Sequence, residues 1–218
     1  MTTQREAKSA IRSEQVLAAA LTLFCEHGYA ATSTRRIADA AGVAEGLVFH
    51  FFGSKERLLL EVAARQNTFA GRVLTLVQNV GDGTARALFR AVAAGLADVS
   101  REEGAFIGFM LAEAQVNPSL RTHIVTATAV VLEGLTTTLA KRVETGEISA
   151  EASLSAAAHG FFGGFLFFFS QHRHLGAVAW RREAESFAEA WAEQCWRGIA
   201  SLDSLSGDSS RGRKKVQR

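Results

Sequence analysis

The order of hydrophobic and polar residues predicts helices along most of the chain. Between residues 9 and 27, Leu17, Leu21 and Phe24 recur three or four positions apart, which places them on one face of a helix. Comparable spacings return in residues 59–80, 84–101, 118–143, 149–169 and 183–202. A single Pro among 218 residues leaves little to interrupt long helices. We therefore expect an all-α fold.

Two short helical segments, Thr34–Ala41 and Ala44–Phe51, form the outline of a helix-turn-helix. Ile37 gives the first segment an inward face, and Leu47 can pack the second segment against it. Gly42 stands where the first helix must stop, and glycine adopts the left-handed conformation at least cost. The second helix is then free to enter a DNA major groove.

Hydroxyl side chains precede the first of these two segments. Thr32, Ser33 and Thr34 offer an N-cap, since a side-chain oxygen there accepts a backbone N–H. A helix amino terminus with free donors is also a phosphate site. Both roles fit the three residues.

These segments belong to a longer motif, VLAAALTLFCEHGY, ATSTRRIADAAGV and AEGLVFHFFGSKERLL, which runs from Val16 to Leu60. The motif resembles the amino-terminal DNA-binding domain of TetR-family transcriptional regulators. The resemblance implies a three-helix helix-turn-helix DNA-binding domain in residues 1–54. It further implies a helical effector-binding and dimerisation domain in residues 55–205, acting in a homodimer that a small-molecule effector controls.

The resemblance places the contacts with double-stranded DNA on the helix-turn-helix and just after it. The residues at the matching positions are Thr34, Arg35, Ala44, Glu45, Gly46, Leu47, Phe49, His50 and Lys55.

Three of these positions depart from the usual family pattern. Ala44 and Glu45 stand where Ser and Lys are common, so an N-cap of about 1 kcal/mol is missing and an anion replaces a cation. Phosphates would repel Glu45, but its carboxylate suits the amino group of a cytosine. Phe49 replaces a phosphate-binding Tyr. Affinity then depends on His50, Lys55 and two arginines, Arg35 and Arg36.

After Lys55 the apolar spacing predicts one long helix that ends before Gly81. Its inward seam has one strongly polar member, Gln66, which either faces a ligand cavity or bonds to a neighbouring helix. Thr84 can cap a further helix, a turn is expected at Gly104, and Pro118 suits the first turn of the next helix.

The family leads us to expect an effector cavity, and the sequence nominates apolar walls with a few polar groups. The alternative for each residue, which we favour, is an ordinary place in the core. The candidates are Gln66, Phe69, Phe106, Phe109, Met110, Gln115, His123 and Ile124.

The carboxy-terminal third presents more aromatic surface than one domain face needs. Phe162, Leu166 and Phe169 line a second side of the helix that follows Ser149. The resemblance implies that the last two helices pair with their copies in a four-helix bundle, although a role within one chain is the alternative. The residues expected at the dimer interface are Phe161, Phe165, Phe168, Phe187, Trp191 and Cys195.

Charge is concentrated at the carboxy terminus. The chain carries a formal charge of +2, yet residues 1–210 hold 19 cations against 22 anions, a charge of −3. The remaining basic residues belong to a polar tail, residues 206–218, which we expect to be disordered. The tail either adds nonspecific attraction to DNA or is a solvated appendage.

Other features narrow the class of protein. The amino terminus has no apolar signal region, and the most apolar window, residues 156–169, is shorter than the ~20 residues of a membrane span. We expect a cytoplasmic protein with two free thiols, no cofactor and no metal site. No catalytic motif emerges, so we expect no enzyme. The alternatives are an effector-independent regulator or activator, and a helical carrier of apolar ligands.

Overall fold

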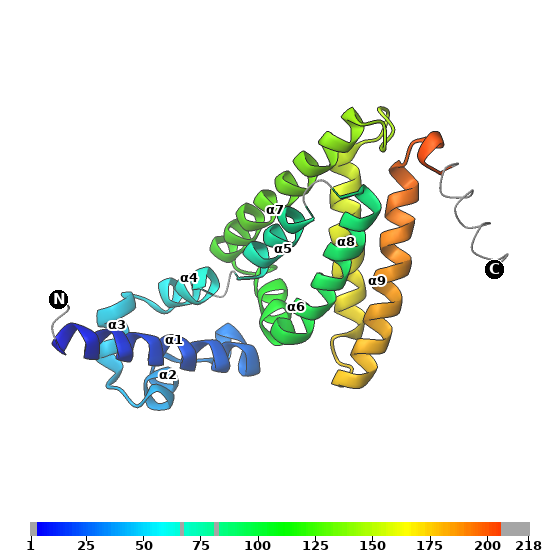
Figure 1. Ribbon diagram of the computed structural model, residues 1–218. Helices are drawn as coiled ribbons and strands as arrows, with labels where there is room; N and C mark the ends of the chain where they lie inside the picture. Colours follow the sequence, from blue (N-terminus) through cyan, green and yellow to red (C-terminus); the bar gives the residue numbers. More distant parts are fainter. Residues whose placement is uncertain (1–3, 66–67, 81–82, 206–218) are drawn as a thin grey trace. The chain divides into compact units, whose positions relative to one another are not determined.

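The computed structural model describes residues 4–65, 68–80 and 83–205, without the side chains of Arg5, Arg65, Thr68 and Phe69. These residues form helices joined by short connections, and no strand occurs among them (Figure 1). The expected all-α fold is confirmed. The helices are α1 (Gln4–Ala31), α2 (Thr34–Ala41), α3 (Glu45–Phe52), α4 (Lys55–Arg65), α5 (Thr68–Asn79), α6 (Ala85–Glu113), α7 (Pro118–Glu144), α8 (Leu154–His172) and α9 (Ala177–Ile199).

The chain divides into two compact units. One unit comprises residues 1–68 and 105–126, and the other comprises residues 69–104 and 127–218. Helices α6 and α7 each contribute residues to both units. The sequence-based boundary between residues 54 and 55 stays a prediction, and the tail from residue 206 lies outside the described residues.

The first unit has its own hydrophobic core. Val16 and Phe24 of α1, Ile37 of α2 and Val48 of α3 are buried in it. The ring of Phe109, from α6, stacks on that of Phe24 with centroids 5.9 Å apart. Residues near the carboxy-terminal end of α6 therefore complete the core beneath the helix-turn-helix.

In the second unit, α8 and α9 lie side by side (Figure 1). The buried residues of α9 recur three or four positions apart, and the three alanines among them let the helix approach its neighbours closely. These residues are Trp180, Ala184, Ala188, Ala192, Trp196 and Ile199. The indole Nε1 of Trp180 donates to the carbonyl of Ala97 on α6 at 3.3 Å, which satisfies the buried polar atom.

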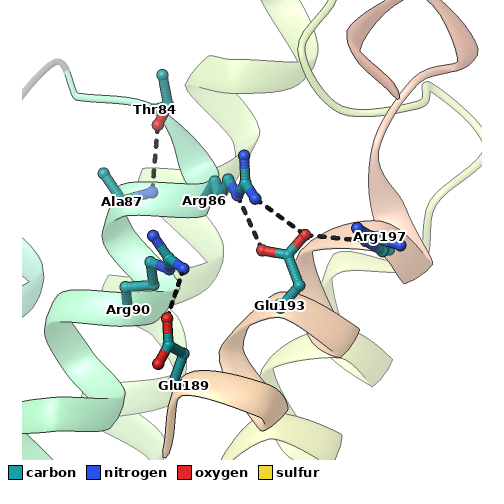
Figure 2. Close-up of polar contacts among 7 residues, drawn as sticks. All are labelled: Thr84, Arg86, Ala87, Arg90, Glu189, Glu193 and Arg197. Atoms are coloured by element: carbon teal, nitrogen blue, oxygen red, sulfur yellow. Dashed lines mark hydrogen bonds and ion pairs between the residues drawn. The ribbon is translucent and has the colours of Figure 1, made fainter. Parts of the chain in front are cut away.

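Ion pairs join α6 to α9 within the second unit (Figure 2). Arg86 donates to both carboxylate oxygens of Glu193, at 2.8 and 3.2 Å, and Arg197 donates to the same carboxylate at 2.9 Å. One turn further along, Arg90 donates to Glu189 at 2.9 Å. Partial burial favours a raised pKa for Glu193, but the hydrogen bonds from Arg197 and Arg86 outweigh it and hold the pKa below its ordinary value.

Some predicted helix boundaries are wrong, and one is not tested. The continuity of the long helix expected after Lys55 stays a prediction, because residues 66–67, between α4 and α5, lie outside the described residues. The turn expected at Gly104 is absent, because α6 continues through this residue to Glu113. Helix α9 begins at Ala177 rather than Glu183.

Gly104 lies in the interior of α6, close to an aromatic ring of α8. A Cβ placed on it would lie 3.5 Å from the Phe169 ring. The glycine thus fits a position of ordinary van der Waals contact between two helices and does not end a helix. Of the residues expected on a second side of α8, Phe169 is buried and Leu166 is exposed.

By length and composition, α7 alone among the described helices could cross a membrane, and 17% of its most apolar stretch is buried. A single helix of this kind also occurs in soluble proteins.

Candidate nucleic-acid interface

Helices α2 and α3 have the bounds that the sequence predicts, to within one residue. The connection turns at Gly42, whose φ of 66° and ψ of 34° lie in the left-handed region. Its N–H bonds to the carbonyls of Ala38 and Asp39, and the N–H of Val43 reaches Ala38 at 3.0 Å. These bonds satisfy carbonyls that the end of α2 would otherwise leave unpaired. The turn therefore fixes the direction in which α3 leaves α2.

The three hydroxyl residues before α2 have separate roles. Ser33 is the N-cap, because its Oγ accepts the N–H of Arg36 at 3.2 Å. Thr32 is fully buried, and its hydroxyl bonds to the carbonyl of Gly28 at 2.8 Å, so it holds the end of α1. Both hydroxyls are thus engaged with the backbone.

Thr34, the first residue of α2, bonds to the first residue of α3. Its Oγ1 donates to Oε1 of Glu45 at 2.6 Å. Two residues that the resemblance assigns to DNA contacts are thus brought together across the turn. The hydrogen bond ties together the amino termini of the two helices, where a recognition helix contacts base edges.

The outward face of α3 is open to solvent. Glu45, Gly46 and His50 are exposed, and Phe49 exposes 48% of its surface. Val48 and Phe52 face the core, and Leu47 is half-buried between them and the exposed face. Ala44 caps α3 without any side-chain bond, as the sequence predicts. Arg35 is exposed on α2.

Lys55 opens α4 but does not extend freely into solvent. Its Nζ lies 4.1 Å from the centroid of the Tyr29 ring, within the range of a cation–π contact. Partial burial lowers the pKa of Lys55, although the carboxylate of Glu113 opposes this shift. A phosphate contact from Lys55 would draw the ammonium away from this ring.

The candidate effector residues do not form one group. Phe109 and Met110 are buried in the core of the first unit, with Phe106 and Ile124 packed against it. Gln115 is exposed. Gln66 and the side chain of Phe69 lie outside the described residues.

His123 differs from these residues. Its Nε2 is buried and has no hydrogen-bond partner among the described residues. Among the described candidates, His123 alone has a buried polar atom without a partner.

The rings predicted at the dimer interface pack within one chain. Phe161, Phe165 and Phe168 of α8 are buried. Phe187 of α9 stacks on Phe168 with ring centroids 4.1 Å apart, and Trp191 donates through Nε1 to the carbonyl of Phe161 at 3.2 Å. These rings hold α8 against α9.

Cys195, the sixth predicted interface residue, is half-buried beside them. Burial raises the pKa of its thiol to about 11, so the thiol stays protonated at neutral pH.

Sequence reasoning missed two of these features. The bond between Thr34 and Glu45 follows from no short motif, because the two residues are eleven positions apart. The contact between Lys55 and the Tyr29 ring was missed as well. Tyr29 follows the predicted end of the first helix at residue 27, and this placement could have suggested a contact.

The fold and this site define a class. An all-α chain whose α2 and α3 meet at a left-handed glycine, with an exposed outward face on α3, is a helix-turn-helix DNA-binding protein.

Comparison with known proteins defines the family. Residues 16–62 match the profile of "Bacterial regulatory proteins, tetR family". The transcriptional repressor AcnR of Corynebacterium glutamicum is 26% identical over 142 residues, which cover 65% of this chain and 71% of that protein. The repressor KstR2 of Rhodococcus jostii is 49% identical over 51 residues, 23% of this chain and 25% of its own length. Residues 16–62 therefore carry the amino-terminal domain of the tetR family of bacterial regulatory proteins.

A solved structure extends the likeness in fold beyond the helix-turn-helix. The TetR family transcriptional regulator PfmR of Thermus thermophilus superimposes with a TM-score of 0.66 at 24% identity. The superposition covers 85% of this chain and 99% of that one. The carboxy-terminal helices are therefore folded as in that regulator.

Proposed function

We propose that this chain is a cytoplasmic transcriptional repressor that binds a pseudo-palindromic operator as a homodimer and is released by a small-molecule effector. The observation that carries the proposal is the α2–α3 pair, whose turn at Gly42 leaves the outward face of α3 exposed. The relatives named AcnR and KstR2 are repressors, which supports repression rather than activation of transcription.

Within this proposal the DNA contacts divide into two kinds. Arg35 and Lys55 neutralise phosphates and His50 contacts the DNA backbone, which supplies affinity for any sequence. Glu45, Gly46 and Phe49 lie on the exposed face of α3, where base edges are read. Leu47 supports this face from the partly buried side.

A selection of random duplexes by the purified chain tests this function. We expect enrichment of a two-fold symmetric sequence. The double variant Lys55→Ala with His50→Ala should lose affinity for all duplexes about equally, with a shallower dependence on salt. A chain that enriches no sequence would contradict the proposal.

The dimer surface we propose differs from the buried rings of α8. Ala156, Gly160, Gly163 and Phe167 are spaced four, three and four residues apart and are all exposed, so they form one stripe on α8. Phe167 exposes 68% of its surface. A Cβ on Gly160 or Gly163 would meet no heavy atom within 4 Å, so a second helix has room to approach.

We further propose that the effector acts through α6 and α7. Helix α6 begins in the second unit and ends in the first, and α7 begins in the first unit and ends in the second. A ligand that binds one of two arrangements of these helices more tightly would shift residues 105–126, which share the core of the helix-turn-helix, and lower operator affinity. Operator titrations with and without a candidate effector test this coupling, and equal affinities at saturation would contradict it.

A further inference from the structure

We infer that Glu45 reads a cytosine in the operator and that Thr34 positions its carboxylate for this contact. This inference rests on the proposed function, because it assigns a base to a residue of the proposed reading face. It begins from the 2.6 Å hydrogen bond between the Thr34 hydroxyl and Oε1 of Glu45.

The hydrogen bond fixes which atoms remain available. The Thr34 hydroxyl has one proton, and it is donated to Glu45. A phosphate oxygen only accepts, so this side chain cannot bond a phosphate while it holds the carboxylate. Thr34 is therefore a positioning residue for Glu45 and not itself a phosphate contact.

Glu45 retains one free oxygen. Among the described residues, no hydrogen bond or ion pair engages Oε2, and the side chain is exposed at the first position of α3. The amino end of a recognition helix lies against base edges in the major groove. A bond at Oε1 limits the rotation of the carboxyl group and so reduces the entropy lost when Oε2 meets a base.

The chemistry of the carboxylate selects the base. It only accepts, and the major-groove donors are the amino groups of cytosine and adenine. Adenine sets its N7 acceptor beside the amino group, and this nitrogen repels a carboxylate. Cytosine has no such acceptor on its own edge. Guanine and thymine present acceptors alone, so Glu45 should reject both.

Selection from random duplexes with wild type and three variants tests the assignment. Glu45→Gln can still accept from Thr34, but its amide suits adenine, so the preferred pair at one position of each half-site should change from C·G to A·T. Thr34→Val should weaken the cytosine preference by about 3-fold to 10-fold at that position only, because a single bond is involved. Thr34→Ser, which keeps the hydroxyl, should restore it.

Glu61→Gln is the matched control, because Glu61 is exposed on α4 outside the reading face. It should select the same sequence as wild type. Thermal melting of each variant shows whether the fold is retained. A purely structural role for either residue would lower the affinity for every duplex equally, without changing the preferred base.

The possible failures are distinguishable. If wild type enriches no sequence, the proposed function fails and this inference fails with it. If wild type enriches a symmetric operator but Glu45→Gln selects the same base at every position, only the assignment of Glu45 is overturned.

Discussion

At the scale of single residues, Gly164 shows how closely α8 and α9 pack. A Cβ on Gly164 would lie 2.7 Å from Cε2 of the Trp191 indole, which is inside van der Waals contact. The indole cannot withdraw easily, because its Nε1 donates to the Phe161 carbonyl at 3.2 Å. Glycine is therefore required here for space.

We predict that Gly164→Ala destabilises the protein by about 1–3 kcal/mol, the usual range for an overpacked core. Gly198→Ala on α9 is the control, because Gly198 is exposed and the new methyl group meets nothing within 4 Å there. Because alanine favours a helix over glycine, the control should gain about 0.5–1 kcal/mol in monomer stability. Equal melting temperatures for the two variants would contradict this packing.

Glu193 carries a prediction about pH. Hydrogen bonds from Arg197 and Arg86 hold its folded pKa below the ordinary value of 4.5, despite partial burial. Its charge therefore stabilises the fold fully above about pH 4.5, and this contribution is lost as the pH falls through the lower, folded pKa.

We expect Glu193→Gln to cost about 1 kcal/mol at pH 7, since the pair with Arg86 uses both carboxylate oxygens. The difference from wild type should narrow as the pH falls below 4.5. Urea unfolding at several pH values measures it, with the exposed Glu185→Gln as control. A difference that does not change with pH would count against the ion pair.

At the scale of elements, α2 and α3 differ in how their amino termini are capped. Ser33 accepts the N–H of Arg36 at 3.2 Å, whereas Ala44 offers α3 no side-chain acceptor. An N-cap contributes about 1 kcal/mol, so one of the two helices that form the reading head lacks a common source of stability.

We predict that Ala44→Ser stabilises the protein by about 1 kcal/mol and that Ser33→Ala destabilises it by about as much. Ala40→Ser, at an exposed position inside α2, is the control and should be slightly destabilising. Thermal unfolding followed by circular dichroism compares the three. If Ala44→Ser is no more stable than Ala40→Ser, the terminus of α3 is satisfied in another way.

The elements also show what the sequence could and could not predict. Gly42 and the flanking apolar residues predict α2 and α3 closely, because turn chemistry and helical spacing are local. Gly104 predicts a turn on the same grounds, yet it lies inside α6 beside Phe169, a residue far along the chain. Local sequence does not distinguish a glycine that ends a helix from one that lies in the interior of a helix.

In the candidate site, too, local features could be predicted from the sequence, whereas contacts between distant residues could not. Helical spacing separates the exposed Phe49 from the buried Val48, so the reading face of α3 could be anticipated. The partners of Glu45 and Lys55 could not, because Thr34 and Tyr29 reach them only through the tertiary fold. For the same reason, the abundance of Phe on α8 did not reveal which rings α9 already covers.

At the scale of the whole molecule, the account depends on a second copy of the chain. Phe167 lies exposed at the end of the stripe that begins with Ala156, Gly160 and Gly163, and an apolar ring in such a stripe gains from being covered. We predict that Phe167→Glu shifts the chain from dimer to monomer in analytical ultracentrifugation at micromolar concentration. Val116→Glu, at a position that is 75% exposed outside α8, should leave the dimer intact. Monomeric wild type, or a dimeric Phe167→Glu variant, would contradict this interface.

The central claim is that α2 and α3 form a head that distinguishes one DNA sequence from others. Its most direct measurement is the affinity of the purified chain for a selected duplex and for a scrambled duplex of the same composition at one salt concentration. The account predicts that the selected duplex binds tighter by about 10³-fold or more, with two chains per duplex and half-sites about one helical turn apart. Equal affinities for the two duplexes would contradict it.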